Sequence, residues 1–129
     1  MATVIVNGAR AIYTNLVSGL GGTAPNYWGI GSGSTAASAT DTALTTEYTT
    51  GTWTGYARKN AAPTRTTVTL TNDTISWSNS WTAGASQTVA ETGAFDAATS
   101  GNMLLHSVFS GVALSSGDSI SIAGTLQFT

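Results

Sequence analysis

The stretch RTTVTLTNDTISWSNSW, residues 65–81, alternates apolar and polar side chains on both sides of Asn72 and Asp73. Side chains of a β-strand point to its two faces in turn, so this alternation indicates two strands. Asn and Asp suit a two-residue hairpin turn. A turn there would place three pairs on one face: Leu70 with Ile75, Val68 with Trp77, and Thr66 with Asn79. The stretch therefore predicts a hairpin with Trp77 in the core.

The C-terminal segment predicts a second hairpin. Apolar residues or glycine occupy every second position from 120 to 128, and SSGD, residues 115–118, suits a turn. The expected pairs are Ala113 with Ile120, Phe109 with Gly124, and Leu105 with Phe128. In this register the Phe109 ring would cover Gly124, an arrangement that stabilises glycine within sheets.

The rest of the sequence predicts two helices and three further strands. Residues 8–20 have apolar side chains at helical spacing, with Asn7 as N-cap and Gly21 at the end, which predicts an amphipathic helix packed on the sheet. A short second helix is expected at DTALTTEY, residues 41–48, with Thr40 or Asp41 as its cap and Leu44 turned inward. Further strands are expected at TVIV, at QTVAE and around Tyr56. Together these elements predict a mainly β protein, a jelly-roll-like β-sandwich.

Length and composition narrow the class of protein. The 129 residues suit one domain, 1–129, with a mixed helix and loop part to residue 60 and a hairpin-rich β part from 61 to 129. Charged residues make up 8% of the chain, against roughly 25% in ordinary soluble domains. With four basic residues and no apolar run of about 20, we expect a soluble protein made in the cytoplasm that binds neither nucleic acid nor membrane.

The glycine-rich stretch NYWGIGSGSTAASATDTALTTE, residues 26–47, does not match a nucleotide-binding motif. A phosphate-binding P-loop requires a Lys after its last glycine, and no basic residue lies between Arg10 and Arg58. We therefore expect Gly29, Gly31 and Gly33 to form a structural turn that lets backbones approach closely.

No set of residues matches a catalytic or metal-binding motif. The single histidine, His106, lies within the strand pattern MLLHSVF, and no serine motif accompanies it to form a triad with Asp96 or Asp118. Glu91 and Asp96 are candidate paired carboxylates, but their spacing crosses a glycine turn. One histidine and no cysteine exclude the usual transition-metal sites, and the acids are too scattered for calcium. We expect no enzymatic activity, no cofactor and no metal.

Aromatic residues are the remaining functional signal. Tyr27, Trp28, Trp53 and Tyr56 lie in predicted loops, where they are candidate contacts for a protein partner. Exposed rings of this kind are also stacking platforms in carbohydrate-binding modules, which leaves glycan binding as an alternative function.

Five ordered blocks resemble small structural proteins of tailed bacteriophage particles: NGARAI, IGSG followed by TDTALTTE, ETGAFDAA, GNMLLHSVF and GDSISIAGTLQF. Ala94 stands where that pattern usually has Leu, and His106 where it often has Arg. The resemblance implies a β-sandwich virion protein, a capsid decoration (cement) protein that binds the major capsid protein and copies of itself as a homotrimer on the capsid surface. A tail or fibre component is the alternative. The resemblance implies no catalytic residue.

Overall fold

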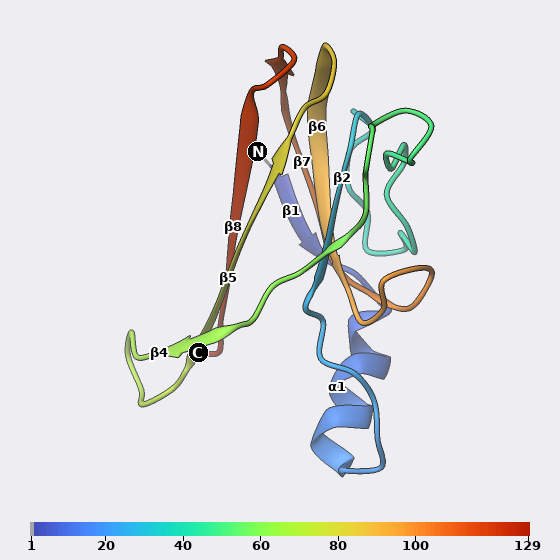
Figure 1. Cartoon of the computed structure of the whole chain (residues 1–129). Coiled ribbons are helices and arrows are strands. Elements are labelled where there is room, and N and C mark those ends of the chain that lie inside the picture. Colours follow the sequence, from blue (N-terminus) through green and yellow to red (C-terminus); the bar gives the residue numbers. More distant parts are fainter. Residues whose placement is uncertain (1) are drawn as a thin grey trace.

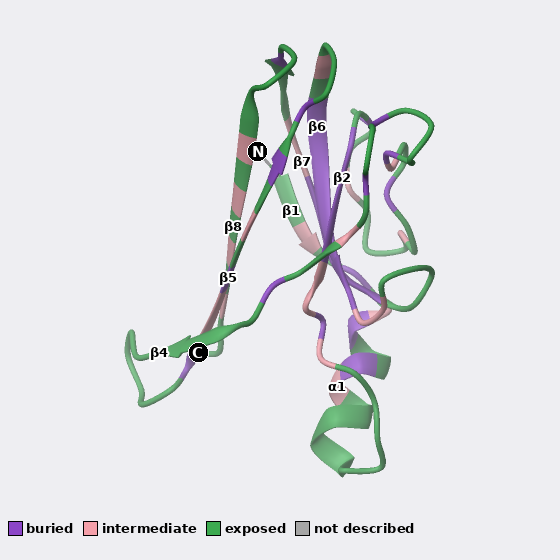
Figure 2. Cartoon of the chain, in the orientation of Figure 1, coloured by how far each residue is buried: buried purple, intermediate pink, exposed green. Residues whose placement is uncertain are grey.

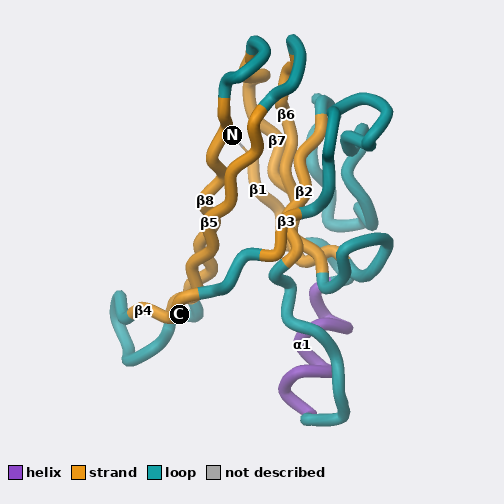
Figure 3. Tube along the Cα trace, viewed as in Figure 1, coloured by secondary structure: helices purple, strands orange, loops and turns teal. Residues whose placement is uncertain are grey.

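The structure, a computed structural model, describes residues 2–129 and contains one helix and eight strands in that part of the chain (Figure 1). Their bounds are β1 Ala2–Ile5, α1 Ala9–Ser18, β2 Tyr27–Gly31, β3 Lys59–Asn60, β4 Thr64–Thr66, β5 Thr74–Thr82, β6 Gln87–Phe95, β7 Met103–Leu114 and β8 Ser119–Gln127. They form two antiparallel sheets, β1-β7-β6-β2-β3 and β4-β5-β8, which face each other as a sandwich (Figure 3). The predicted mainly β sandwich is confirmed.

Both layers are built from one long hairpin. In β5 and β8, Thr74 lies opposite Gln127 and Thr82 opposite Ser119; in β6 and β7, Gln87 lies opposite Leu114. These three pairs share one register, so the pairing of β5 with β8 continues into the pairing of β6 with β7. The hairpin closes through residues 96–102 and bends over at residues 83–86 and 115–118. This bend stacks β5 and β8 on the sheet of β6 and β7.

The first predicted hairpin exists, but its register is wrong. β4 pairs with β5 through Thr66 opposite Thr74, and residues 67–73 form a wide loop in place of a two-residue turn. The predicted pairs of Leu70 with Ile75, Val68 with Trp77 and Thr66 with Asn79 do not form. The cause is Asp73, whose carboxylate accepts hydrogen bonds from the backbone N–H groups of residues 68–70 and so holds that segment out of the strand. Trp77 is buried, as predicted.

The second predicted hairpin is wrong because β7 and β8 lie in different sheets. None of its pairs forms: Ala113 with Ile120, Phe109 with Gly124, or Leu105 with Phe128. The turn at 115–118 does form, but it attaches to the end of β5: Ala83 N–H donates to the Asp118 carbonyl (2.7 Å) and Gly117 N–H to the Ala83 carbonyl (2.7 Å). β8 therefore continues along β5, and the ring that covers Gly124 is Trp28.

The predicted first helix is confirmed with different ends. Gly8 replaces Asn7 at the N-cap, and the helix ends at Gly19, whose φ of 69° is left-handed, two residues before Gly21. Only its first part packs on the sandwich, through Ala9 and Ile12. The far half projects beyond the sheets and is exposed (Figure 2).

The predicted second helix is wrong, since residues 41–48 contain no helical turn. Asp41 does not cap a helix; its carboxylate accepts hydrogen bonds from Ser38 N–H (2.8 Å) and from His106. Leu44 is buried, as predicted. Tyr56 also lies outside a strand, because β3 begins at Lys59.

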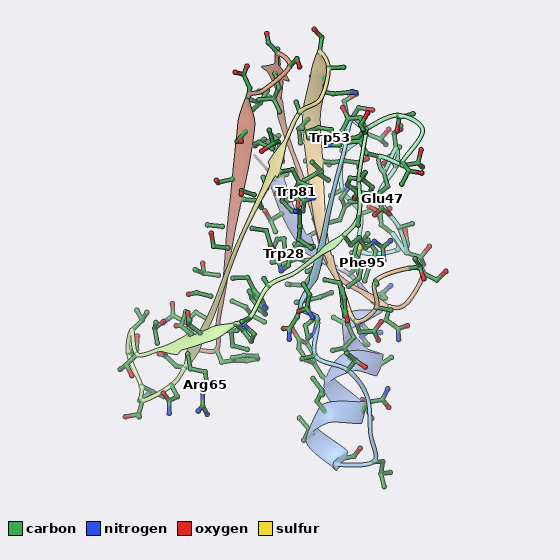
Figure 4. The ribbon with its side chains drawn as sticks, in the orientation of Figure 1. Trp28, Glu47, Trp53, Arg65, Trp81 and Phe95 are labelled. Atoms are coloured by element: carbon green, nitrogen blue, oxygen red, sulfur yellow. The ribbon has the colours of Figure 1, made fainter. Side chains whose placement is uncertain are left out.

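The core lies between the sheets and is rich in tryptophan. Trp28 from β2 and Trp77 from β5 meet with ring centroids 5.8 Å apart. Figure 4 shows Trp28 and Trp81 between the two sheets. All four tryptophans of the chain are buried, and the contact between Trp28 and Trp77 joins the two layers.

Candidate functional site

The four aromatic candidates lie mostly inside the protein. Trp28, Trp53 and Tyr56 are 2%, 3% and 8% exposed, and Tyr27 is half-buried. Tyr27 and Trp28 belong to strand β2 and not to a loop. The folded chain therefore offers three of these rings to its own core, and Tyr27 alone keeps a partly exposed ring for a partner.

Tyr56 belongs to a polar cluster that joins three loops. Its hydroxyl accepts a hydrogen bond from Ile30 N–H (3.1 Å) and donates one to Glu47 (2.9 Å). Burial, reinforced by the Glu47 charge, raises the pKa of Tyr56. Arg58 binds the same carboxylate with two hydrogen bonds, 2.7 and 2.8 Å long, and its guanidinium carbon lies 3.4 Å from the centroid of the Phe95 ring.

The Arg58 side chain also donates to the carbonyl of Ser100 (2.8 Å), in the turn that closes the long hairpin. Figure 4 shows Glu47 and Phe95 on the same side of the five-stranded sheet. The side chains of Glu47, Tyr56 and Arg58 thus bond to one another and to the backbone, and the cluster fixes loops.

His106 lies on β7 between two carboxylates. Its Nδ1 is 2.7 Å from Asp41 and its Nε2 is 2.9 Å from Glu91, and the ring is 1% exposed. Both ring nitrogens are therefore occupied by carboxylate partners within the protein. Neither nitrogen has a serine hydroxyl as its hydrogen-bond partner. The arrangement therefore cannot act as a nucleophile–base pair.

Asp41 is the half-buried end of this row of three side chains. Hydrogen bonds from Ser38 N–H and from the His106 ring hold the pKa of Asp41 below its usual value. The strand pattern correctly places His106 in a buried strand, but the acids at the ring are Asp41 and Glu91, and neither Asp96 nor Asp118.

The glycine-rich stretch surrounds the buried carboxylate of Glu91. Gly33 N–H, Thr45 N–H and Thr46 N–H donate to it at 3.2, 2.9 and 2.6 Å. A Cβ atom at Gly33 would lie 2.5 Å from a Glu91 oxygen, and one at Gly31 would overlap the Thr46 carbonyl. Close approach is therefore the reason for these glycines, as predicted. The predicted turn is wrong, because Gly29 and Gly31 lie within strand β2 and pair with β6. The anion that the stretch holds is the protein's own carboxylate.

The remaining acid candidates hold turns. Asp96 accepts hydrogen bonds from Asn102 N–H (2.7 Å) and from the Asn102 side chain (3.0 Å), and Asp118 accepts one from Ser115 N–H (2.8 Å). Glu91 and Asp96 therefore have separate structural partners. Within residues 2–129, no group of three acidic, histidine or cysteine side chains is placed to hold a metal ion. None of the helices described there is long and apolar enough to span a membrane.

One side of the sandwich is open. A groove of about 590 Å³ runs between the two sheets there, and its lining comes from β1, β7 and β8 together with Trp28 of β2 and Thr92 of β6. Phe109, Ile120 and Ile122 are only half-buried along it. The Trp28 indole N–H has no hydrogen-bond acceptor among the described residues. We call the free edges of β1 and β8, with the groove between them, the open side.

Large apolar side chains are also exposed at the end of the sandwich that carries α1. Leu16, Val17 and Leu20 are exposed on and just after the helix, and Phe128 packs edge-on against Tyr13 at the C-terminal end of the chain. Exposed apolar groups of this kind are typical of surfaces that another protein covers.

Comparison with known proteins identifies the family. A family model described as podophage GP4 fiber I protein gp80 matches residues 7–129. No curated protein and no solved structure matches the chain. Because the family model spans nearly the whole sequence, the chain belongs to the podophage GP4 fiber I protein gp80 family and is a bacteriophage structural protein.

Proposed function

We propose that this chain is a non-enzymatic component of a podophage fibre. The match of residues 7–129 to a family described as a fiber protein carries the proposal. The tail or fibre alternative from the sequence resemblance fits this description better than capsid decoration does, because the description names a fibre.

The site chemistry supports a structural role. The only histidine is held between Asp41 and Glu91, and Glu91 is fully buried behind three backbone N–H groups. A general acid or base must reach the reacting group directly or through one water molecule. These side chains face the protein interior, so they stabilise loops.

The surface supports assembly with protein neighbours. A subunit that is covered by others gains stability from apolar contact and loses it wherever a charge becomes buried without a partner. The chain has few charges, and it exposes apolar residues on α1 and along the open side. Fibre subunits, including further copies of this chain, are the partners we propose.

Glycan binding receives less support from the structure. Carbohydrate-binding modules need exposed aromatic faces, whereas all four tryptophans are buried in this protein. Glycan recognition through this chain would have to use Tyr27 or hydroxyl groups.

Labelling of purified virions tests the proposal. Gold-conjugated antibodies against this chain, viewed by electron microscopy, should decorate the fibres and leave the heads unlabelled. Label on the heads would instead support the capsid decoration protein and would overturn the fibre assignment. Fibreless particles, which should carry no label at all, are the matched control.

A further inference from the structure

The four edge strands of the sandwich differ in how well they are protected from pairing with another chain. β3 has two residues, one of them Lys59, and β4 has three, with Arg65 at its centre. Short length and charge are the usual means by which proteins prevent pairing at a sheet edge. β8 is nine residues long, Ser119–Gln127, and contains no charge and no proline. The fourth edge strand, β1, also has no charge and no proline but only four residues, Ala2–Ile5. Among the described residues, β8 is therefore the longest free edge, and neither short length nor charge protects it.

Hydrogen bonds at the two ends of β8 show which backbone groups are free. Phe128 N–H donates to the Asp73 carbonyl (2.9 Å), and the Asp118 carbonyl accepts from Ala83 N–H (2.7 Å). Backbone groups of successive residues point to opposite sides of a strand. The even-numbered residues of β8 therefore bond to β5. The N–H and C=O groups of the odd-numbered residues point to the free edge, from Ser119, Ser121, Ala123, Thr125 and Gln127.

We propose that β8 pairs antiparallel with β8 of a second copy of this chain, about a two-fold axis at Ala123. This register uses the whole strand, with Ser121 opposite Thr125 of the second copy and Ile122 opposite Gly124 of the second copy. The two three-stranded sheets become one continuous six-stranded sheet.

The side-chain pattern of β8 is complementary to itself in this register. Ile120, Ile122 and Leu126 lie on the groove side, and small polar residues and Ala123 lie on the outer face. The two-fold pairing places Ile120 beside Leu126 of the second copy, so apolar groups meet at the mouth of the groove and cover it. The absence of charge on β8 means that identical strands do not repel each other.

Two positions on the outer face of the three-stranded sheet allow a matched pair of lysine variants. Ala123 and its neighbour on β5, Ser78, are both exposed and lie directly opposite each other. In the dimer, two lysines at position 123 would face each other at about 5.5 Å between Cα atoms. Two lysines at position 78 would be separated by three strand spacings, roughly 14 Å, which exceeds the Debye length at physiological salt.

Sedimentation of the purified full chain tests the pairing. We expect a dimer for the unmodified protein and for Ser78→Lys, and at least a tenfold weaker dimer for Ala123→Lys, with circular dichroism showing that both variants fold. A monomer at high concentration, or equal effects of the two variants, would overturn the proposal.

Hydrogen exchange followed residue by residue by NMR gives a second test that needs no variant. Dimerisation should protect the amides of Ser121, Ala123 and Thr125 in a concentration-dependent way, by at least about tenfold. Amides of the even-numbered residues, which bond to β5 in either state, are the internal control. A trimer in which the odd-numbered amides exchange freely would support the three-fold assembly expected from the resemblance and would refute pairing through β8.

This pairing goes beyond the proposed function and does not depend on it. Virion labelling reports where the chain lies in the particle, and sedimentation reports how two copies meet, so either can fail without the other.

Discussion

Glu91 has a carboxylate at a fully buried position of β6, where it accepts hydrogen bonds from Gly33, Thr45 and Thr46 and pairs with His106. A buried charge that loses its partner costs several kcal/mol, whereas the paired charge costs little. Glu91 therefore fixes three separated segments of chain at one point, and each of these segments depends on its carboxylate as a hydrogen-bond partner.

Replacing Glu91 tests this dependence. Glu91→Gln puts an NH₂ group among the N–H donors of Gly33, Thr45 and Thr46 and leaves some of these buried groups without an acceptor, so we expect a loss of about 3 kcal/mol in the free energy of unfolding. Asp41→Asn, the same chemical change at the more exposed end of the row, should cost less than about 2 kcal/mol. Urea denaturation measures both. Equal losses would show that burial of Glu91 is not what makes it important.

Asp73 predicts a dependence of stability on pH. Hydrogen bonds from the N–H groups of Leu70 and Val68 hold the pKa of Asp73 well below its usual value. A lowered pKa stabilises the fold above the unfolded-state pKa, near 4, and this stabilisation is lost as the pH falls through the folded-state value.

Thermal unfolding from pH 6 down to pH 2 should therefore show a smaller loss of Tm for Asp73→Asn than for the unmodified protein. At pH 6 the variant should be the less stable of the two. Parallel curves for the two proteins would contradict this account of Asp73.

Glu91 and His106 also show which contacts could not be predicted from the sequence. An isolated Glu within the apolar strand QTVAETGAF is a signal of a buried polar group. Its partner His106 lies on the next strand, and Asp41, which contacts the other nitrogen of His106, comes from a distant loop that the topology brings to the ring. The burial of His106 is a local property and could be predicted. Its two partners could not, because they depend on which strands are neighbours.

At the scale of elements, strand positions were predictable, whereas the register of β4 on β5 and the partner of β8 were not. Alternation places β5, β7 and β8 close to their actual bounds, because it reports which face of a strand is apolar. It does not report which apolar face lies opposite. The turn at 115–118 joins two sheets and the loop at 96–102 joins two neighbours, yet both are short polar segments with glycine between apolar strands.

Gly124 shows how closely the two layers fit. A Cβ atom there would overlap the indole ring of Trp28. We expect Gly124→Ala to lower the free energy of unfolding by about 1–3 kcal/mol through overpacking. Gly84→Ala is the matched control, since the nearest atom to its Cβ would be 3.5 Å away, and it should change stability by less than about 0.5 kcal/mol. Chemical denaturation measures the free energy of unfolding of both variants. An unchanged value for Gly124→Ala would mean that the sheets can separate at this point.

The last strand should be essential to the fold. Deleting residues 119–129 removes the partner of β5 along its whole length and uncovers Trp77 and Trp81. Three half-buried aliphatic side chains are lost as well, each contributing about 1 kcal/mol, against a total stability of 5–15 kcal/mol. We expect an unfolded or aggregated chain by circular dichroism.

Deleting only residues 128–129 is the control for that truncation. It removes the half-exposed Phe128, its N–H bond to Asp73 and its contact with Tyr13, and should cost about 1–2 kcal/mol. A folded 1–118 chain would show that β8 is an arm that serves a neighbour more than its own sandwich.

Over the whole molecule, the few acidic side chains form hydrogen bonds within the chain. Each of its six carboxylates accepts a hydrogen bond from another part of the protein. The acids therefore hold loops in place, and hydroxyl and apolar groups make up most of the surface.

Attachment to the particle should consequently resist salt. At 1 M NaCl the Debye length is about 3 Å, which weakens contacts between exposed charges but not apolar or backbone contacts. We expect virions washed in 1 M NaCl to retain this chain, and virions treated with urea to release it, as measured by immunoblotting. Release by salt alone would assign the attachment to the exposed basic residues Arg10, Lys59 and Arg65.

The folded-over hairpin of residues 74–127 also has a consequence for how the chain folds. Pairing can begin at the loop of residues 96–102 and advance toward both ends through the two register shifts of β6 and β7, with each new pair adding only a small further loss of chain entropy. β1 and β2 can join only after β7 and β6 have formed the surfaces that receive them. The C-terminal half should thus nucleate folding, and the N-terminal segments should order last.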